Sequence, residues 1–109
     1  MKEIKAYIKK HKLDDVIRSL RKIEGLTGVS LIDNCGYGIG WGGAKREGQI
    51  DCRPGVKVEI VCLEALVDEV VASIEKAAHT GLKGDGKIYV GNIEQAVRIS
   101  TGERGEGAV

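Results

Sequence analysis

The chain of 109 residues has no phenylalanine, one proline, one tryptophan and one methionine. Its apolar runs are only a few residues long, so we expect no segment that spans a bilayer. The charges of opposite sign nearly balance, with 17 basic residues against 16 acidic ones, which argues against recruitment by nucleic acid or by an anionic membrane surface. The short apolar runs argue against direct membrane insertion. The N-terminus lacks the apolar core of a signal peptide. We therefore expect one small cytoplasmic domain over residues 1–109, helped by self-association.

Cysteine is also scarce. Cys35, Cys52 and Cys62 form an odd set without a C-x-x-C pair, and His11 and His79 are far apart, which argues against a disulfide framework and a standard zinc site. The simplest interpretation is that the thiols are reduced. Two alternatives stay open for Cys35 and Cys52: a disulfide that limits the shapes of the loop between them, or a soft metal bound with a third ligand. Cys62 alternates with apolar residues and is expected in the core.

Glycine, by contrast, is abundant, with sixteen residues that concentrate in residues 36–55 and 81–86. The second cluster, Gly81 to Lys87, satisfies the first part of the Walker A pattern, G-x-x-x-x-G-K. Ile88 then stands where a P-loop needs a hydroxyl residue, and a strand-like run follows where a P-loop begins a helix, so a P-loop NTPase is rejected. Backbone amides next to a lysine still favour binding of a phosphate by this loop.

Hydrophobic periodicity predicts the order β-α-β, long loop, β-α-β. The alternation of half-buried strands occurs in residues 2–9, 29–35 and 56–62 and from Lys87 onward, and helical spacing occurs in residues 13–23 and 66–78. A short extended or turn element is expected at 93–100, followed by a flexible C-terminal tail at about 101–109. This order is typical of the α+β class and its ferredoxin-like βαββαβ sandwich, an antiparallel sheet with two helices on one face. The other face must be polar or meet another subunit.

The long loop, residues 36–55, is unusual for so small a domain, and loops of this length are often functional. It contains the only tryptophan, Trp41. Two interpretations stay open: the indole awaits a ligand or partner, or it packs against the body of the protein.

Five stretches carry a family resemblance. They are residues 12–16 (KLDDV), 36–38 (GYG), 56–61 (VKVEIV), 80–81 with 84–90 (TG and GDGKIYV) and 97–99 with 101–103 (VRI and TGE). Together they resemble the PII signal-transduction family over essentially the whole chain. The resemblance implies a homotrimer with adenine-nucleotide sites in the clefts between subunits. It further implies a regulator and not an enzyme, with slow ATP hydrolysis as a side activity at most. Such a regulator responds to ATP, ADP or AMP and acts through the long loop, called the T-loop in this family. Its partner would be a protein such as a membrane transporter or a nitrogen-metabolism enzyme.

The resemblance also implies nucleotide-binding positions. The loop from Gly84 to Lys87 matches the family loop around the phosphates, Arg98 matches a phosphate-binding arginine, and Val61 matches a strand position that contacts adenine. The full set is Ser30, Gly36, Gly38, Ile39, Val61, Gly84, Asp85, Gly86, Lys87, Arg98 and Ser100.

Four positions depart from the family pattern. Ile39 and Gly40 replace an arginine and a glutamine, Gly55 replaces a lysine, and Ser100 replaces a second arginine. The loss of a metal-binding amide and of a carboxylate-binding cation argues against 2-oxoglutarate as a co-ligand and leaves a role for Mg²⁺ open. Fewer cations near the terminal phosphates predict that ADP or AMP competes with ATP.

Two hypotheses about the ligand chemistry remain open at this point. Lys45, Arg46 or Arg53 are candidates to replace the missing cations of the phosphate site. The alternative function is a metal- or redox-responsive regulator on the same fold, which would use Cys35 and Cys52, with His79 as a further candidate ligand.

Overall fold

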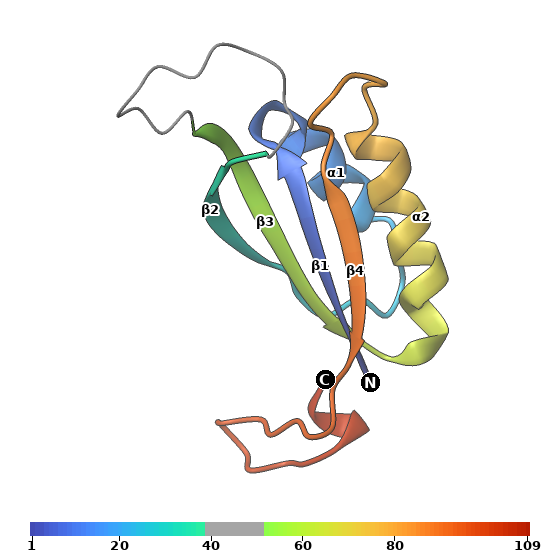
Figure 1. Ribbon diagram of the computed structural model, residues 1–109. Coiled ribbons are helices and arrows are strands. Elements are labelled where there is room, and N and C mark those ends of the chain that lie inside the picture. Colours follow the sequence, from blue (N-terminus) through green and yellow to red (C-terminus); the bar gives the residue numbers. More distant parts are fainter. Residues whose placement is uncertain (39–51) are drawn as a thin grey trace.

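The computed structural model describes residues 1–38 and 52–109 (Figure 1). The expectations for Ile39, Gly40, Trp41, Lys45 and Arg46 lie outside these residues. The elements are β1 (Lys2–Lys9), α1 (Leu13–Leu20), β2 (Ser30–Gly36), β3 (Arg53–Cys62), α2 (Val67–Ala78) and β4 (Lys87–Asn92). Short 3-10 helices occur at Lys10–Lys12, Glu64–Leu66 and Glu106–Ala108.

The four strands form one antiparallel sheet in the order β2-β3-β1-β4, and both helices cover the same face (Figure 1). The predicted α+β, ferredoxin-like arrangement is therefore confirmed. Its centre is the pairing of β1 with β3, in which Ile4 lies opposite Ile60 and Ala6 opposite Val58. Because side chains alternate along a strand, this register directs both apolar rows to the helices.

The core lies between the sheet and the two helices. Val16 and Leu20 of α1 and Val70 and Ile74 of α2 are each at most 2% exposed, at the spacing that places them on one helix face. Cys62 is also buried, as its position in the alternation predicts. No helix in residues 1–38 and 52–109 is long and apolar enough to cross a membrane.

The boundaries of two elements differ from the prediction. The first helix ends at Leu20, and the chain continues in turns in which the Ile23 amide donates to the carbonyl of Leu20 at 3.1 Å. Ile23 is nevertheless buried, so the apolar spacing correctly indicated burial and overestimated the length of the helix. The strands extend into the predicted loop at both ends, since Gly36 pairs with Arg53 at the end of the β2–β3 ladder.

The sheet face opposite the helices carries both charges and aromatic rings. Lys57 forms an ion pair with Glu59 at 2.6 Å, and its ammonium lies 5.8 Å from the centre of the Tyr7 ring. Hydrogen bonding and charge attraction between the pair raise the pKa of Lys57 and lower the pKa of Glu59. The rings of Tyr7 and Tyr89 meet edge to face with centres 6.1 Å apart. This face is therefore neither fully apolar nor fully polar.

Residues 93–109 project from the far end of the sheet (Figure 1). Within them Val97 and Arg104 form an isolated bridge, and the Arg98 amide donates to the carbonyl of Glu103 at 2.8 Å. Gly102, with a φ of +74°, lies in the turn between Arg98 and Glu103. This segment carries two of the predicted site residues, Arg98 and Ser100, away from the sheet.

Candidate functional site

The glycine-rich loop between α2 and β4 is organised by the carboxylate of Asp85. This carboxylate accepts hydrogen bonds from the amides of Thr80 at 2.8 Å and Gly81 at 2.9 Å, and from the Thr80 hydroxyl. The ammonium of Lys9, at the end of β1, lies 3.0 Å from the same carboxylate and donates to the Thr80 hydroxyl at 3.2 Å. A loop with little apolar burial is thus held in one shape by charge-assisted hydrogen bonds.

The electrostatics of this arrangement favour ionised Asp85. The Thr80 hydroxyl, the amides of Thr80 and Gly81 and the Lys9 ammonium lower the pKa of Asp85 far below its usual value. Nδ1 of His79 lies 3.8 Å from the same carboxylate. Lys9 of β1 and the donating amides therefore offset part of the negative charge of Asp85, which reduces its repulsion of an anion bound nearby.

Two glycines allow the loops to approach the end of β1. Gly86 has a φ of +104°, and a Cβ at this position would overlap the carbonyl of Tyr7. On the other side of the strand, a Cβ at Gly55 would lie 2.9 Å from the carbonyl oxygen of Ile8. Gly86 therefore has no room for a side chain in this backbone, whereas at Gly55 a side chain fits only if the neighbouring strand shifts slightly. The glycine loop and the beginning of β3 thus rest on consecutive peptides of β1.

A cavity of about 670 Å³ opens between these segments, at the end of the sheet where the long loop is attached. We call it the loop-end pocket, and its lining includes Lys9, Gly36, Arg53, Gly55, Gly84 and Gly86. Within residues 1–38 and 52–109, no hydrogen bond has the amide of Gly84 or of Gly86 as its donor. Exposed amides and cations around one cavity are the chemistry that suits an anion, so this pocket is the candidate site.

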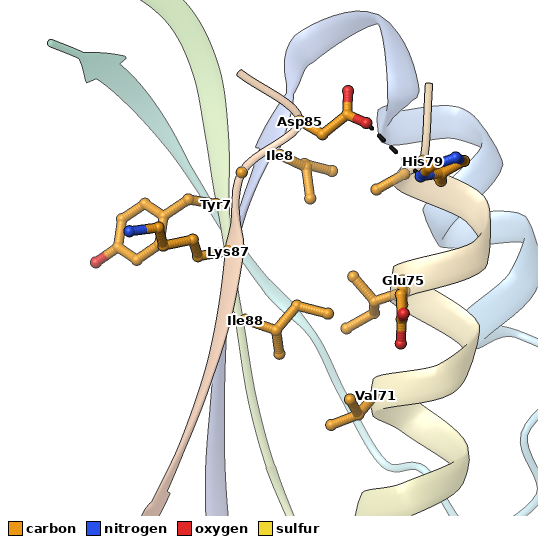
Figure 2. A pocket seen from close by; sticks show the side chains of 11 residues that line it. Tyr7, Ile8, Val71, Glu75, His79, Asp85, Lys87 and Ile88 are labelled. Carbon is orange, nitrogen blue, oxygen red and sulfur yellow. Dashed lines mark ion pairs between the residues drawn. The ribbon is translucent and has the colours of Figure 1, made fainter. Parts of the chain in front are cut away.

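A second cavity, of about 390 Å³, lies on the helix side of the same loop. Figure 2 shows that Ile8, Ile88 and Val71 form its apolar part, while Asp85 and His79 meet at its upper rim. Tyr7 and Lys87 project away from it, to the opposite side of the sheet (Figure 2). The Lys87 ammonium is therefore not directed toward α2 and is available on the open face.

The predicted site residues separate into two groups within one chain. Gly36 and the loop from Gly84 to Lys87 lie at one end of the sheet, and Gly38 follows Gly36 closely. Ser30, paired with Glu59, and Val61, paired with Glu3, lie toward the other end.

The distance between these groups follows from strand geometry. The length of β4, Lys87–Asn92, is about 17 Å at the usual rise per residue, and Arg98 and Ser100 follow beyond it. One phosphate cannot contact Lys87 and Arg98 of the same chain. The two groups can contribute to one site only if a second copy supplies one of them.

Sequence reasoning assigned no role to Lys9 or to the side chain of Thr80. The T-G-x-x-x-D spacing of residues 80–85 was the available signal, because an aspartate in a glycine-rich turn commonly accepts nearby amides. Lys9 gave no comparable signal, since its contact with Asp85 joins residues far apart in the chain.

Cys35 and Cys52 are joined by a disulfide in the structure, with their Cα atoms 5.4 Å apart. The bond lies at the attachment of the long loop, next to the last pair of the β2–β3 ladder. The interpretation that both thiols are reduced is therefore not the one that the structure shows. No group of three or more histidine, cysteine, aspartate or glutamate side chains in the described residues could hold a metal ion.

Comparisons with known proteins identify the family of the chain. The profile of the family described as "Nitrogen regulatory protein P-II" matches residues 1–103. Proteins named "Nitrogen regulatory protein P-II" from Bradyrhizobium diazoefficiens and Rhodospirillum rubrum are each 44% identical to it over 113 aligned positions, which cover 100% of both chains. A protein of the same name from Haemophilus influenzae is 42% identical, again over 100% of both chains. With a four-stranded sheet, two helices on one face and a match over nearly its full length, the chain belongs to the P-II family.

Proposed function

We propose that this chain, as a P-II signal-transduction regulator, binds an adenine nucleotide with its glycine loop and controls a partner protein through residues 36–55. ATP, ADP and AMP are the candidate effectors, with Mg²⁺ as a companion of ATP, and 2-oxoglutarate is not expected as a co-ligand. The chain acts as a regulator and not as an enzyme. The relatives named above are regulatory proteins by name, and this supports a role in the control of nitrogen use.

The observation that carries the proposal is the loop-end pocket. Its wall offers the amides of Gly84 and Gly86, and Lys87 follows directly on the open face of the sheet. Asp85, the acidic group in the loop, is partly compensated by Lys9 and by the amides that donate to it. A phosphate therefore meets donors and a cation with a reduced opposing charge.

The separation of the predicted residues supports a site shared between copies. Arg98 and Ser100 of one chain cannot reach its own Gly84 to Lys87 loop, so a neighbouring copy is the source of one half of the site. We therefore propose a homotrimer, as the resemblance implies, with a nucleotide between each two subunits. The mixed face with Tyr7, Tyr89 and Lys57 is a suitable contact surface for such an assembly.

Isothermal titration calorimetry of the assembled protein with ATP, ADP, AMP and, as a negative control, GTP tests the nucleotide site. We expect saturable binding of at least one adenine nucleotide and a clear loss of affinity in Lys87→Ala. Lys22→Ala, which removes an equal charge from an exposed position beyond α1, should bind as the wild type does. Absence of adenine-nucleotide binding at millimolar ligand would refute the proposal.

The partner can be identified by affinity capture from lysate with and without the nucleotide that binds best. A regulator of this kind should retain its partner in a nucleotide-dependent way. A variant that lacks residues 39–51 should lose the partner and keep its affinity for nucleotide. Capture that is equal for the full chain and for this variant would exclude the long loop as the contact.

A redox response is a second candidate, favoured by the Cys35–Cys52 disulfide at the attachment of the long loop. Oxidation of two thiols forms the bond with release of two protons and two electrons, and a dithiol reductant supplies both in return. If the bond controls the loop, a dithiol should change partner capture by the wild type and leave Cys35→Ser/Cys52→Ser unaffected. Equal capture by oxidised and reduced wild type would eliminate this function.

A further inference from the structure

Arg53 is placed at the loop-end pocket by the backbone on both sides of it. It is the first residue of β3 and lies opposite Gly36 in the ladder. Cys52, which precedes it, is bonded to Cys35, and the following Pro54 lies opposite Cys35 in the ladder. The position of its Cα is thus fixed by strand pairing and by a covalent bond.

The guanidinium of Arg53 reaches the glycine loop. Its Nη1 atom lies 3.5 Å from the point where a Cβ of Gly84 would be, and the Cε atom of Lys9 lies 3.8 Å from the same point. Gly84 has a φ of +84°, so glycine suits this position for its backbone shape as well as for the space it leaves. Two basic side chains therefore enclose Gly84 at the wall of the loop-end pocket.

The two cations have different roles. The ammonium of Lys9 is 3.0 Å from Asp85 and serves to compensate that carboxylate. Arg53, like Lys10, brings a further positive charge to the lining of the pocket, and its planar guanidinium can donate two parallel hydrogen bonds to a phosphate. It stands two positions before Gly55, where the family pattern has a lysine, and so supplies a cation from the same strand end.

We propose that Arg53 binds the terminal phosphate of a nucleoside di- or triphosphate in the loop-end pocket and so determines which adenine nucleotide is preferred. This rests on the proposed function. A polyphosphate that begins at Lys87 and extends past Gly84 meets Arg53 last. A monophosphate can contact Lys87 and the Gly86 amide without reaching the guanidinium, which lies beside Gly84. Arg53 therefore selects by the number of phosphates and not by the base.

The test compares the affinities of ATP, ADP and AMP in wild type, Arg53→Ala, Arg53→Lys and a control, Arg21→Ala. Arg21 is exposed beyond the end of α1 and its replacement removes the same charge. We expect Arg53→Ala to lose roughly 10- to 100-fold in affinity for ADP or ATP, the usual size of a charged hydrogen-bonding group, and less than about threefold for AMP. Arg53→Lys should recover part of the loss, because it restores the charge without the bidentate geometry. Arg21→Ala should match the wild type.

The readout is the ratio of the ADP and AMP affinities, which a purely structural role of Arg53 would not change. An equal loss for all three nucleotides, or no loss, would overturn the inference while nucleotide binding by the wild type still supported the proposed function. If the wild type binds no adenine nucleotide, both are refuted. If Arg53→Ala does not fold, the ratio of the ADP and AMP affinities of Arg53→Lys tests the inference instead.

Discussion

Replacement of Gly86 by alanine tests whether the glycine loop depends on its close approach to β1. The φ of Gly86 is +104°, a region that side chains rarely adopt, and the new Cβ would overlap the carbonyl of Tyr7. Tyr7 is paired with Lys57 on one side and Lys87 on the other, so relief of the overlap must disturb both ladders. Strain of this kind costs about 1–3 kcal/mol before the overlap is added.

Two other glycines separate the cost of backbone strain from the cost of the overlap with Tyr7. Gly102 also has a positive φ, +74°, but nothing lies within 4 Å of its Cβ position, so Gly102→Ala measures backbone strain alone, about 1–2 kcal/mol. Gly28 has open space and no positive φ, so Gly28→Ala should be neutral or stabilise by less than about 1 kcal/mol. Gly86→Ala adds the overlap to the strain, and we expect a loss of at least about 3 kcal/mol, since a peptide in a paired strand must move.

Urea unfolding followed by circular dichroism, at one fixed protomer concentration, measures the three losses. A loss of about 3 kcal/mol should lower the midpoint by roughly 1–3 M urea for a small domain. Nucleotide affinity should fall in Gly86→Ala and stay unchanged in Gly28→Ala, because Gly28 lies outside the loop-end pocket. Gly102→Ala is compared for stability only, since Gly102 turns the segment that carries Arg98. If Gly86→Ala and Gly102→Ala agree within about 0.5 kcal/mol, the close approach to Tyr7 has no energetic consequence and the reasoning fails.

Three further predictions follow from the loop, the disulfide and the core. The lowered pKa of Asp85 implies stabilisation of the loop that is complete above about pH 4, the pKa of an unfolded aspartate, and is lost as the pH falls through the lower folded value. Hydrogen-exchange protection of the Thr80 amide, corrected for intrinsic rates, should therefore decline only below about pH 4. At pH 7, Asp85→Asn should lack most of the protection that the wild type shows. Equal protection of this amide in the two proteins at pH 7 would contradict the prediction. The Cys35–Cys52 bond spans 17 positions, so a dithiol should lower the unfolding free energy of the wild type by about 3 kcal/mol and have no effect on the double serine variant, whereas an unchanged wild-type midpoint would disprove the contribution. Ile74 has 0% exposure, so Ile74→Ala should lower the unfolding free energy by about 2–5 kcal/mol in thermal or urea unfolding. Ile99 is 99% exposed, and Ile99→Ala should lower it by less than about 0.5 kcal/mol. Similar losses in the two variants would show that the core is misplaced.

The fold could be predicted because alternation and helical spacing directly report which side chains are buried. The same property explains the error at the end of α1: Ile23 continues the apolar spacing and is buried, but it lies in a turn beyond Leu20. Periodicity records burial and not the hydrogen bonds that define a helix. The loop boundaries were misjudged for a similar reason, because Pro54 and Gly55 are typical of turns, and only the pairing of Gly36 with Arg53 shows that β3 has already begun.

The site was predictable where its determinants are local. The glycines and Lys87 stand within one short segment, and the pattern alone indicates an anion. The contacts of Lys9 with Asp85 and of Arg53 with Gly84 join residues that are far apart in sequence. Arg53 was one of three candidate cations, and its position beside Gly84 is encoded by no pattern in the sequence; the other two candidates, Lys45 and Arg46, lie outside the described residues.

The placement of Gly55 and Gly86 against consecutive peptides of β1 has a consequence for how a regulator of this kind can evolve. A displacement of the glycine loop would shift the Tyr7 carbonyl, which lies against Gly86. The neighbouring Ile8 carbonyl lies against Gly55, at the root of the long loop. Neither contact includes a side chain that could absorb the movement. Under the proposed function, a signal from the glycine loop to the long loop would pass through main-chain atoms of a single strand end. Conservative substitutions in the apolar interior would then leave that signal intact.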